Sequence, residues 1–154
     1  MDALALWSKL GRSAPGRWLF SRVVCWRAPY FGSIGPTIDE LAPGRCVARI
    51  AHRRAVTNHI GTVHAIALCN LAELVAGVGT EASMPPSMRW IPKGMRVSYL
   101  AKANGTMRAV ATIPPIDPAA GARDLPVEVV VEDPQGTRVF DATIMMWISP
   151  RQPR

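Results

Sequence analysis

One apolar segment brings together a carboxylate and backbone amides that could carry out acyl-transfer chemistry. The segment NHIGTVHAIALCNLAE runs from Asn58 to Glu73, and the apolar run at 63–78 predicts a buried helix. A helix that begins near His64 leaves the amides around His64 and Ala65 unpaired, at the positive end of the helix dipole. Such amides can hold the negative oxygen that develops on a carbonyl during acyl transfer.

Glu73 adds a carboxylate two turns further along the same helix. Its near neighbours on the helix, Cys69, Asn70, Ala76 and Gly77, are small, which predicts a narrow groove and a partly desolvated acid. A carboxylate in that position can act as a general base on water or attack a carbonyl directly. The pattern therefore indicates hydrolysis of an activated acyl group.

The spacing of the two groups has a consequence for assembly. Ala65 and Glu73 are eight residues apart, which is about 12 Å along one helix, so one carbonyl cannot easily touch both. Two copies of the helix, antiparallel across a two-fold axis, would place the amide of one chain opposite the Glu of the other. We therefore expect an obligate homodimer, or a dimer of dimers, if the protein is an enzyme.

Each of these residues also has a purely structural interpretation. Asn58 could cap a turn, His64 could be a core histidine bonded to the backbone, and Glu73 could lie at a solvent-facing helix edge. Only their joint spacing favours the catalytic interpretation. The three histidines lack metal-ligand spacing and the three cysteines lack a C-x-x-C motif. We therefore expect no metal site, and reduced cysteines in a cytoplasmic protein.

The remaining pattern predicts an α+β fold in which a sheet of about five to six antiparallel strands wraps around the central helix, because that helix is apolar on every side. The predicted strands lie at 34–41, 45–53, 95–100, 106–113, 127–132 and 138–148. Gly77 and Gly79 are expected to end the central helix, and Asn104-Gly105 is expected to form a hairpin turn. The predicted divisions are an N-terminal helical extension at 1–31, the main domain at 32–149 and a frayed tail at 150–154.

The N-terminal extension carries most of the excess positive charge. The chain has 18 basic and 11 acidic residues, for a net charge of +7, and the first 31 residues account for +4 of it. Residues 3–28 predict one or two helices, broken or bent at Pro15-Gly16. We expect a basic face in water, or a membrane-surface helix in which Trp and Arg meet the interface. No signal peptide is expected, and no uncharged apolar segment of about 18 residues is present.

The segment resembles the signature of hotdog-fold acyl-CoA thioesterases. That signature runs Asn or Gln, then a glycine, His-Gly-Gly, and Asp or Glu nine residues after the His; here Asn58 precedes His64 by six residues and Glu73 follows it by nine. The wider context, RRAVTNHIGTVHAIALCNLAELVAG with RWIPKGMRVSYL, is similar to an uncharacterised branch of that superfamily, a domain of unknown function related to phenylacetate-pathway and 4-hydroxybenzoyl-CoA thioesterases. The resemblance covers roughly residues 30–149.

The resemblance implies a hotdog fold and a role for each residue of the signature. Glu73 would be the catalytic carboxylate, the Ala65 amide would polarise the thioester carbonyl, Asn58 would hydrogen-bond the carbonyl or water, and His64 would help shape the turn. The chain departs from the pattern at two places. His-Gly-Gly is His64-Ala65-Ile66, and Gly77 stands where some relatives carry a hydroxyl that holds water.

Coenzyme A would enter as part of the substrate, with no separate cofactor. Arg89, Lys93 and Arg96 could meet its phosphates, or could form a solvated basic edge. The leading hypothesis is hydrolysis of an acyl-CoA thioester. The alternatives are a non-catalytic acyl- or lipid-binding hotdog protein and a hotdog dehydratase or hydratase, whose His-Phe-Pro segment is absent here. No nucleic-acid partner is expected, because the charge is concentrated at the N-terminus.

Overall fold

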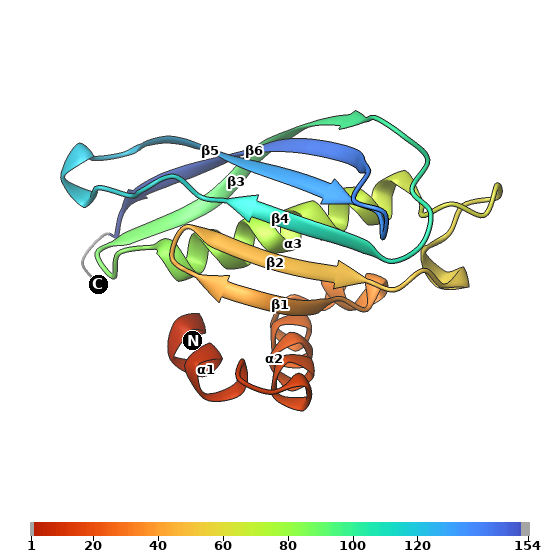
Figure 1. Cartoon of the computed structure of the whole chain (residues 1–154). Coiled ribbons are helices and arrows are strands. Elements are labelled where there is room, and N and C mark those ends of the chain that lie inside the picture. The colour runs from red at the N-terminus through yellow and green to blue at the C-terminus, as the bar shows by residue number, and fades with distance from the viewer. Residues whose placement is uncertain (1, 152–154) are drawn as a thin grey trace.

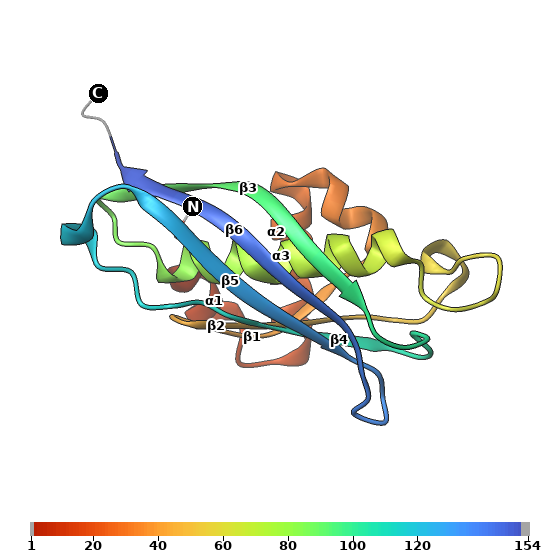
Figure 2. The same cartoon turned by 90° about the horizontal axis from the view of Figure 1, so that it is seen from above.

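Helix α3 (Ala65–Ser83) is the axis around which the other elements are arranged. In the computed structural model, which describes residues 2–151, one six-stranded antiparallel sheet curves over this helix (Figures 1 and 2). The strands are β1 (Thr37–Ala42), β2 (Arg45–Ile50), β3 (Met88–Tyr99), β4 (Met107–Thr112), β5 (Arg123–Glu132) and β6 (Arg138–Pro150), in the order β1-β2-β4-β5-β6-β3. The expected α+β hotdog arrangement is confirmed.

Shorter helices precede or link these elements. They are α1 (Ala3–Leu10), α2 (Ala14–Arg27) and the 3-10 turns η1 (Pro29–Ile34), η2 (Arg54–Val56) and η3 (Pro118–Ala120). Pro15 was expected to break the N-terminal helical region, but it lies in the first turn of α2, where its missing N–H has no helical partner to lose. The break falls instead at Gly11–Ser13, and the Ser13 hydroxyl caps α2 by accepting from Gly16 N.

The core lies between the concave face of the sheet and α3. Along β6, Ala142, Ile144, Met146 and Ile148 alternate with more exposed residues, as expected for a strand with one face against a helix. By length and composition alone α3 could also cross a bilayer, but 67% of the relevant window is buried within the protein. It is therefore a core helix of this domain, and its apolar sides are covered by its own sheet.

Gly77 and Gly79 do not end α3, contrary to expectation; the helix continues to Ser83. Both glycines are buried positions where another element comes close. A Cβ at Gly79 would lie 2.4 Å from Ile113 Cδ1 and 3.1 Å from Cys46 Cβ, and one at Gly77 would lie 3.2 Å from the Trp90 ring. The glycines therefore permit close packing, and burial of the helix outweighs their low helix propensity of about 1 kcal/mol each.

The space around Gly79 is tighter than the space around Gly77, which predicts opposite outcomes for alanine substitutions at the two positions. Gly79→Ala should destabilise the protein by about 1–2 kcal/mol, because overpacking of about 1–3 kcal/mol exceeds the gain in helix propensity. Gly77→Ala should be neutral or stabilising by up to about 1 kcal/mol, since Trp90 is only partly buried and can shift. Urea unfolding measures both. Ile113→Val removes the clashing methyl and should recover part of the Gly79→Ala loss; an equal loss in both backgrounds would contradict this explanation.

Strand β3 is longer than expected and has a different partner. The Asn104-Gly105 turn was expected to join two paired strands, but β3 pairs with β6 and not with β4. The hairpin prediction was therefore wrong: Gly105 does adopt a turn conformation at φ +82°, in the connection that carries the chain from one sheet edge to an interior strand. A local turn signal does not specify which strands pair, because pairing is decided by burial across the whole sheet.

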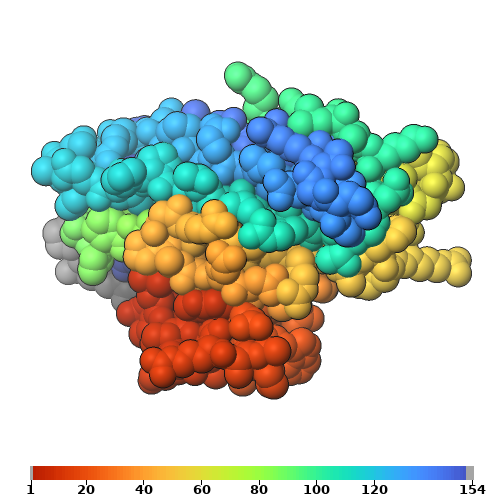
Figure 3. All heavy atoms as spheres, viewed as in Figure 1, coloured from red at the N-terminus to blue at the C-terminus, as the bar shows by residue number. Residues whose placement is uncertain are grey.

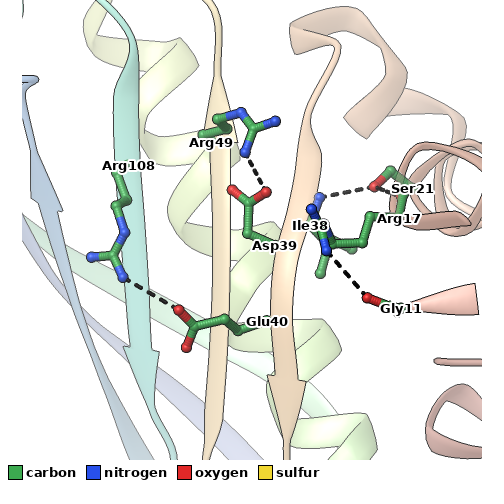
Figure 4. Close-up of polar contacts among 8 residues, drawn as sticks. All are labelled: Gly11, Arg17, Ser21, Ile38, Asp39, Glu40, Arg49 and Arg108. Atoms are coloured by element: carbon green, nitrogen blue, oxygen red, sulfur yellow. Dashed lines mark hydrogen bonds and ion pairs between the residues drawn. The ribbon is translucent and has the colours of Figure 1, made fainter. Parts of the chain in front are cut away.

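The two edges of the sheet are treated differently. At the β1 edge, the buried Ser21 hydroxyl of α2 accepts from Ile38 N at 2.8 Å and donates to Arg17 O at 2.7 Å (Figure 4). Helix α2 therefore covers this edge and satisfies one of its amides. Strand β3 forms the other edge, and most of its residues are exposed. Long exposed edges are templates for pairing with another strand.

Candidate functional site

The side of α3 that the sheet leaves open carries the predicted catalytic acid. Ile66, Cys69 and Glu73 follow one another at spacings of three and four residues, so they share one face of the helix. Ile66 is 56% exposed, and Cys69 and Glu73 are half-buried. Strand β3 borders this face on one side, and on the other Asn70 Nδ2 donates to Tyr30 O and Ser33 Oγ of η1.

A bulge in β3 determines which of its side chains face α3. The pairing with β6 shifts register between Pro92 and Gly94, which reverses the alternation of side chains. Before the bulge Trp90 packs over Gly77 of α3, and after it Tyr99 contacts Cys69 of α3. A proline and a glycine two residues apart, Pro92 and Gly94, are the sequence signal for such a bulge within a strand.

The Glu73 carboxylate lies in a hollow between α3 and the bulge. The hollow measures about 270 Å³ and is lined by Glu73, Pro92, Lys93, Gly94, Met95 and Ile144. Within residues 2–151, the Glu73 carboxylate has no hydrogen bond and no ion pair. Lys93 also lines the hollow, but its ammonium is paired with Asp124 at 2.8 Å. Both carboxylate oxygens therefore remain available to a water molecule or to a substrate.

The N-terminus of α3 carries the second predicted functional group, a backbone amide without a partner. His64 is the N-cap, and its Nδ1 accepts a hydrogen bond from Ile66 N at 3.1 Å, so the ring proton of this tautomer is on Nε2. The Ala65 amide has no acceptor among the residues that the structure describes. This amide is thus an available donor at the positive end of a 19-residue helix.

Asn58 holds the turn that leads into α3. Its Oδ1 accepts from Ile60 N and Thr62 N, both at 3.1 Å, and its Nδ2 donates to Thr62 Oγ1 at 2.7 Å. Gly61 closes the turn at φ +82°, a conformation that favours glycine. One Nδ2 hydrogen of Asn58 remains for a substrate carbonyl or water, and the other polar capacity of the side chain is used to shape the loop.

The predicted site residues therefore fall into two groups within one chain. Asn58, His64 and Ala65 meet at the start of α3, whereas Glu73 lies eight residues further on, about 12 Å along the axis. One reacting carbonyl cannot contact both groups. Between residues 2 and 151, no cluster of three His, Cys, Asp or Glu side chains could hold a metal ion.

The three cations expected near coenzyme A phosphates all lie on β3, on the sheet face turned away from α3. Arg89 donates to Ser149 Oγ at 3.2 Å, and the Lys93 ammonium lies 5.0 Å from the Trp147 ring centroid. Arg96 is opposite Thr143 in the register, and directly opposed residues point to the same face. Arg89 and Arg96 have no ion pair in the described part of the chain, whereas Lys93 is paired with Asp124.

Two side-chain contacts of α3 with β3 were not anticipated from the sequence. Tyr99 OH lies 3.3 Å from Cys69 Sγ, and Trp90 Nε1 donates to Glu81 Oε2 at 2.7 Å. Cys69 could have been suspected, because it lies one turn before Glu73 on the same helix face. Its tyrosine partner is thirty residues away, and no local pattern identifies it. The hydrogen bond with Cys69, with partial desolvation, raises the pKa of Tyr99 to about 12.

The Tyr99 contact predicts a titration that can be followed optically. In a Tyr30→Phe background Tyr99 is the remaining tyrosine, and its absorbance change near 295 nm should be centred near pH 12. Cys69→Ala should return the midpoint towards about 10, the ordinary value for tyrosine. Because the folded-state pKa is the higher one, the contact stabilises the fold fully below about pH 10 and loses this effect as pH rises towards 12. An unchanged midpoint in Cys69→Ala would contradict the assignment.

The fold and site define the chain as a hotdog protein, with a central helix that carries an acid and a free N-terminal amide. It belongs to the DUF4442 family, a domain of unknown function, whose model matches residues 16–148. No functionally curated protein matches the sequence.

Several solved structures share the fold. The genomics target APC5556 is 43% identical, with a TM-score of 0.84 over 97% of this chain and 99% of that one. A Pseudomonas aeruginosa protein described as a probable thioesterase is 22% identical, with a TM-score of 0.75 over 84% and 93%. A Haemophilus influenzae thioesterase is 10% identical, with a TM-score of 0.73 over 86% and 90%. The structural neighbours of this chain thus include thioesterases.

Proposed function

We propose that the protein hydrolyses an acyl-CoA thioester at a site that two copies of the chain complete together. The observation that carries this proposal is the division of the site on α3. The Glu73 carboxylate and the Ala65 amide are both free of internal partners, yet are about 12 Å apart along one helix. The thioesterases among the structural neighbours support the same reaction.

The exposed surface around β3 supports the assembly that this site needs. Large apolar side chains with 36–62% exposure are distributed along and beside β3 and at the start of α3: Ile60, Ile66, Ile91, Met95, Tyr99 and Leu100. Exposed apolar clusters of this kind mark interaction surfaces. Pairing of β3 with β3 of a second chain would satisfy the edge and bring the two α3 helices together antiparallel across a two-fold axis.

In the proposed reaction, Glu73 takes a proton from water as the water oxygen attacks the thioester carbonyl. The carbonyl oxygen becomes an oxyanion that accepts from the amide of the partner subunit's Ala65. The intermediate collapses, the C–S bond breaks, and the thiolate of coenzyme A takes the proton that Glu73 holds. Direct attack by Glu73 would instead give an anhydride that water then hydrolyses. The guanidinium groups of Arg89 and Arg96, which have no ion pair within the described residues, would bind the phosphates of coenzyme A.

The direct test is release of free thiol from a panel of acyl-CoA esters that covers short, medium and long aliphatic chains and aryl groups. We expect turnover of at least one class by the full chain. With an enoyl-CoA substrate, any loss of enoyl absorbance should be matched by release of free thiol. Thiol release from none of the panel would contradict the proposal, and loss of enoyl absorbance without thiol release would favour a hydratase instead.

The dimer can be tested separately from the chemistry. Ile66→Asp places a carboxylate on the open face of α3 and removes no contact from the core, because Ile66 is 56% exposed. We expect this variant to sediment as a folded monomer and to lose activity, since burying an unpaired charge costs several kcal/mol. Leu19→Asp is the matched control, because Leu19 is 45% exposed on α2. Equal masses for wild type and Ile66→Asp would contradict the dimer.

A second candidate function is acyl binding without hydrolysis. Two observations favour it: Ala65 and Ile66 replace small glycines at the helix start, and the Trp90 ring covers Gly77, where a water-holding hydroxyl would otherwise stand. Saturable binding of an acyl-CoA with no turnover of it would identify this function.

A further inference from the structure

We propose that the outward face of α2 docks onto an anionic lipid surface. This face consists of Trp18, Leu19 and Trp26, and it belongs to an N-terminal segment with an excess of basic residues. The proposal concerns where the protein works and is independent of the reaction at Glu73.

Helix α2 is apolar on two opposite sides, although only one of them faces the protein. Phe20 and Val24 point into the core and are at most 8% exposed. Trp18, Leu19 and Trp26 point the other way and are 58%, 45% and 79% exposed. A helix that covers a sheet edge needs a single apolar stripe. The second stripe is not needed to cover the sheet edge, and two exposed indoles within one helix indicate a surface that is buried by something else.

The N-terminal segment that contains this face is strongly basic. From residue 3 to residue 38 the sequence has five basic residues and no acidic residue. Lys9 and Arg12 are exposed, whereas Arg27 lines a hollow on the inner side of α2 with Val24, Glu81 and Trp90. None of the five basic residues has an ion pair in the described part of the chain. The half-buried Arg22 guanidinium donates to Pro36 O at 2.6 Å and its Nε is buried, so this arginine adds little to the exposed charge. The complement of this surface is negatively charged.

The combination of indoles and arginines favours a membrane over a soluble polyanion. Trp side chains partition to the boundary between headgroups and acyl chains, and each Lys or Arg near an anionic leaflet contributes about 1 kcal/mol. A polyanion in water would match the arginines but would leave the indoles solvated. An anionic bilayer can bury the indole rings and pair with the basic side chains at the same time.

The position of α2 also suits docking. Figure 3 shows the N-terminal residues as a lobe that projects from the body of the molecule, and α2 covers the β1 edge of the sheet. The proposed dimer uses β3, at the other end of the strand order. Lipid docking and strand pairing therefore involve separate elements of the fold.

Co-sedimentation of the full chain with vesicles tests the proposal. The vesicles are phosphatidylcholine alone or phosphatidylcholine with one quarter phosphatidylglycerol, at low salt and at 0.5 M salt. We expect pelleting only with the anionic vesicles, weakened by salt, and a blue shift of tryptophan emission on binding. Absence of pelleting with anionic vesicles, or equal pelleting with both compositions, would overturn the proposal.

Two pairs of substitutions locate the surface. Trp18→Ser/Trp26→Ser and Lys9→Glu/Arg12→Glu should each lower the apparent vesicle affinity by about tenfold or more. Arg54→Glu/Lys102→Glu makes the same change in net charge at exposed residues elsewhere and should leave binding within about twofold. If the control pair weakens binding as much as the two N-terminal pairs, the attraction is only that of net charge. If Trp18→Ser/Trp26→Ser instead changes the oligomeric mass, the face is a contact between copies; either result rejects the lipid site.

Discussion

Glu73→Gln should lower the rate of acyl-CoA hydrolysis by about 10²–10⁴-fold, the usual contribution of a general base. Glutamine keeps the size of the side chain and cannot take a proton from water. The Glu73 carboxylate has no hydrogen-bond or ion-pair partner in the described part of the chain, so its replacement breaks no contact. The expected loss is in kcat, measured by thiol release at saturating substrate, with little change in the unfolding midpoint.

Glu81→Gln is the matched control for this experiment. Glu81 lies two turns further along α3, is exposed, and accepts from Trp90 Nε1, a role that the amide oxygen of glutamine can keep. We expect near wild-type activity from this variant. If Glu73→Gln and Glu81→Gln retain the same activity, Glu73 is a structural residue and the acid must be sought elsewhere.

The second large effect is expected from Ala65→Pro, which removes a single hydrogen-bond donor. Ala65 is the first residue of α3, a position that proline tolerates, and His64 already has the extended conformation, φ −65° and ψ 140°, that a following proline requires. The substitution therefore deletes the amide proton and preserves the helix. Loss of one oxyanion donor should lower kcat by about 10²–10³-fold.

Ala65→Gly is the control that keeps the amide. It should retain activity, or gain some, because the methyl group narrows the approach to the backbone. Circular dichroism and the unfolding midpoint should be similar for the proline and glycine variants. Full activity in Ala65→Pro would show that this amide does not touch the reacting carbonyl.

The sequence was sufficient to predict the fold because its patterns are strong and agree with one another. The alternating run in β6 and the fully apolar α3 each indicate one kind of burial, and together they require a sheet around a helix. The length of α3 was misjudged, since Gly77 and Gly79 have two possible meanings. A glycine can end a helix or admit a neighbour, and only the positions of Trp90 and Ile113 decide between them.

Strand pairing was predicted less well, for a related reason. Asn104-Gly105 specifies a turn, but which strands flank each other depends on contacts between β3 and β6, which are distant in sequence. A local sequence signal indicates the bulge at Pro92 and Gly94. No local signal indicates how the bulge changes the site. By reversing the alternation of side chains, it brings both Trp90 and Tyr99 to the α3 side of the strand.

The candidate site was predictable as a set of residues but not as an environment. The order Asn58, His64 and Glu73 comes from a linear pattern, and helix geometry gives the separation between Ala65 and Glu73. The free carboxylate and the pairing of Lys93 with Asp124 depend on three-dimensional neighbours. Because Glu73 and the Ala65 amide are too far apart in one chain, the proposed function requires that each reaction centre uses two chains.

Complementation between two inactive variants tests that claim most directly. A Glu73→Gln chain keeps the Ala65 amide, and an Ala65→Pro chain keeps the Glu73 carboxylate. A mixed dimer would therefore contain one intact site and one site that lacks both groups. After co-refolding in equal amounts, half of the dimers should be mixed, and thiol release should return to about a quarter of the wild-type value. If acid and amide act within one chain, both sites of a mixed dimer stay defective, and the mixture will be no more active than the two variants measured apart.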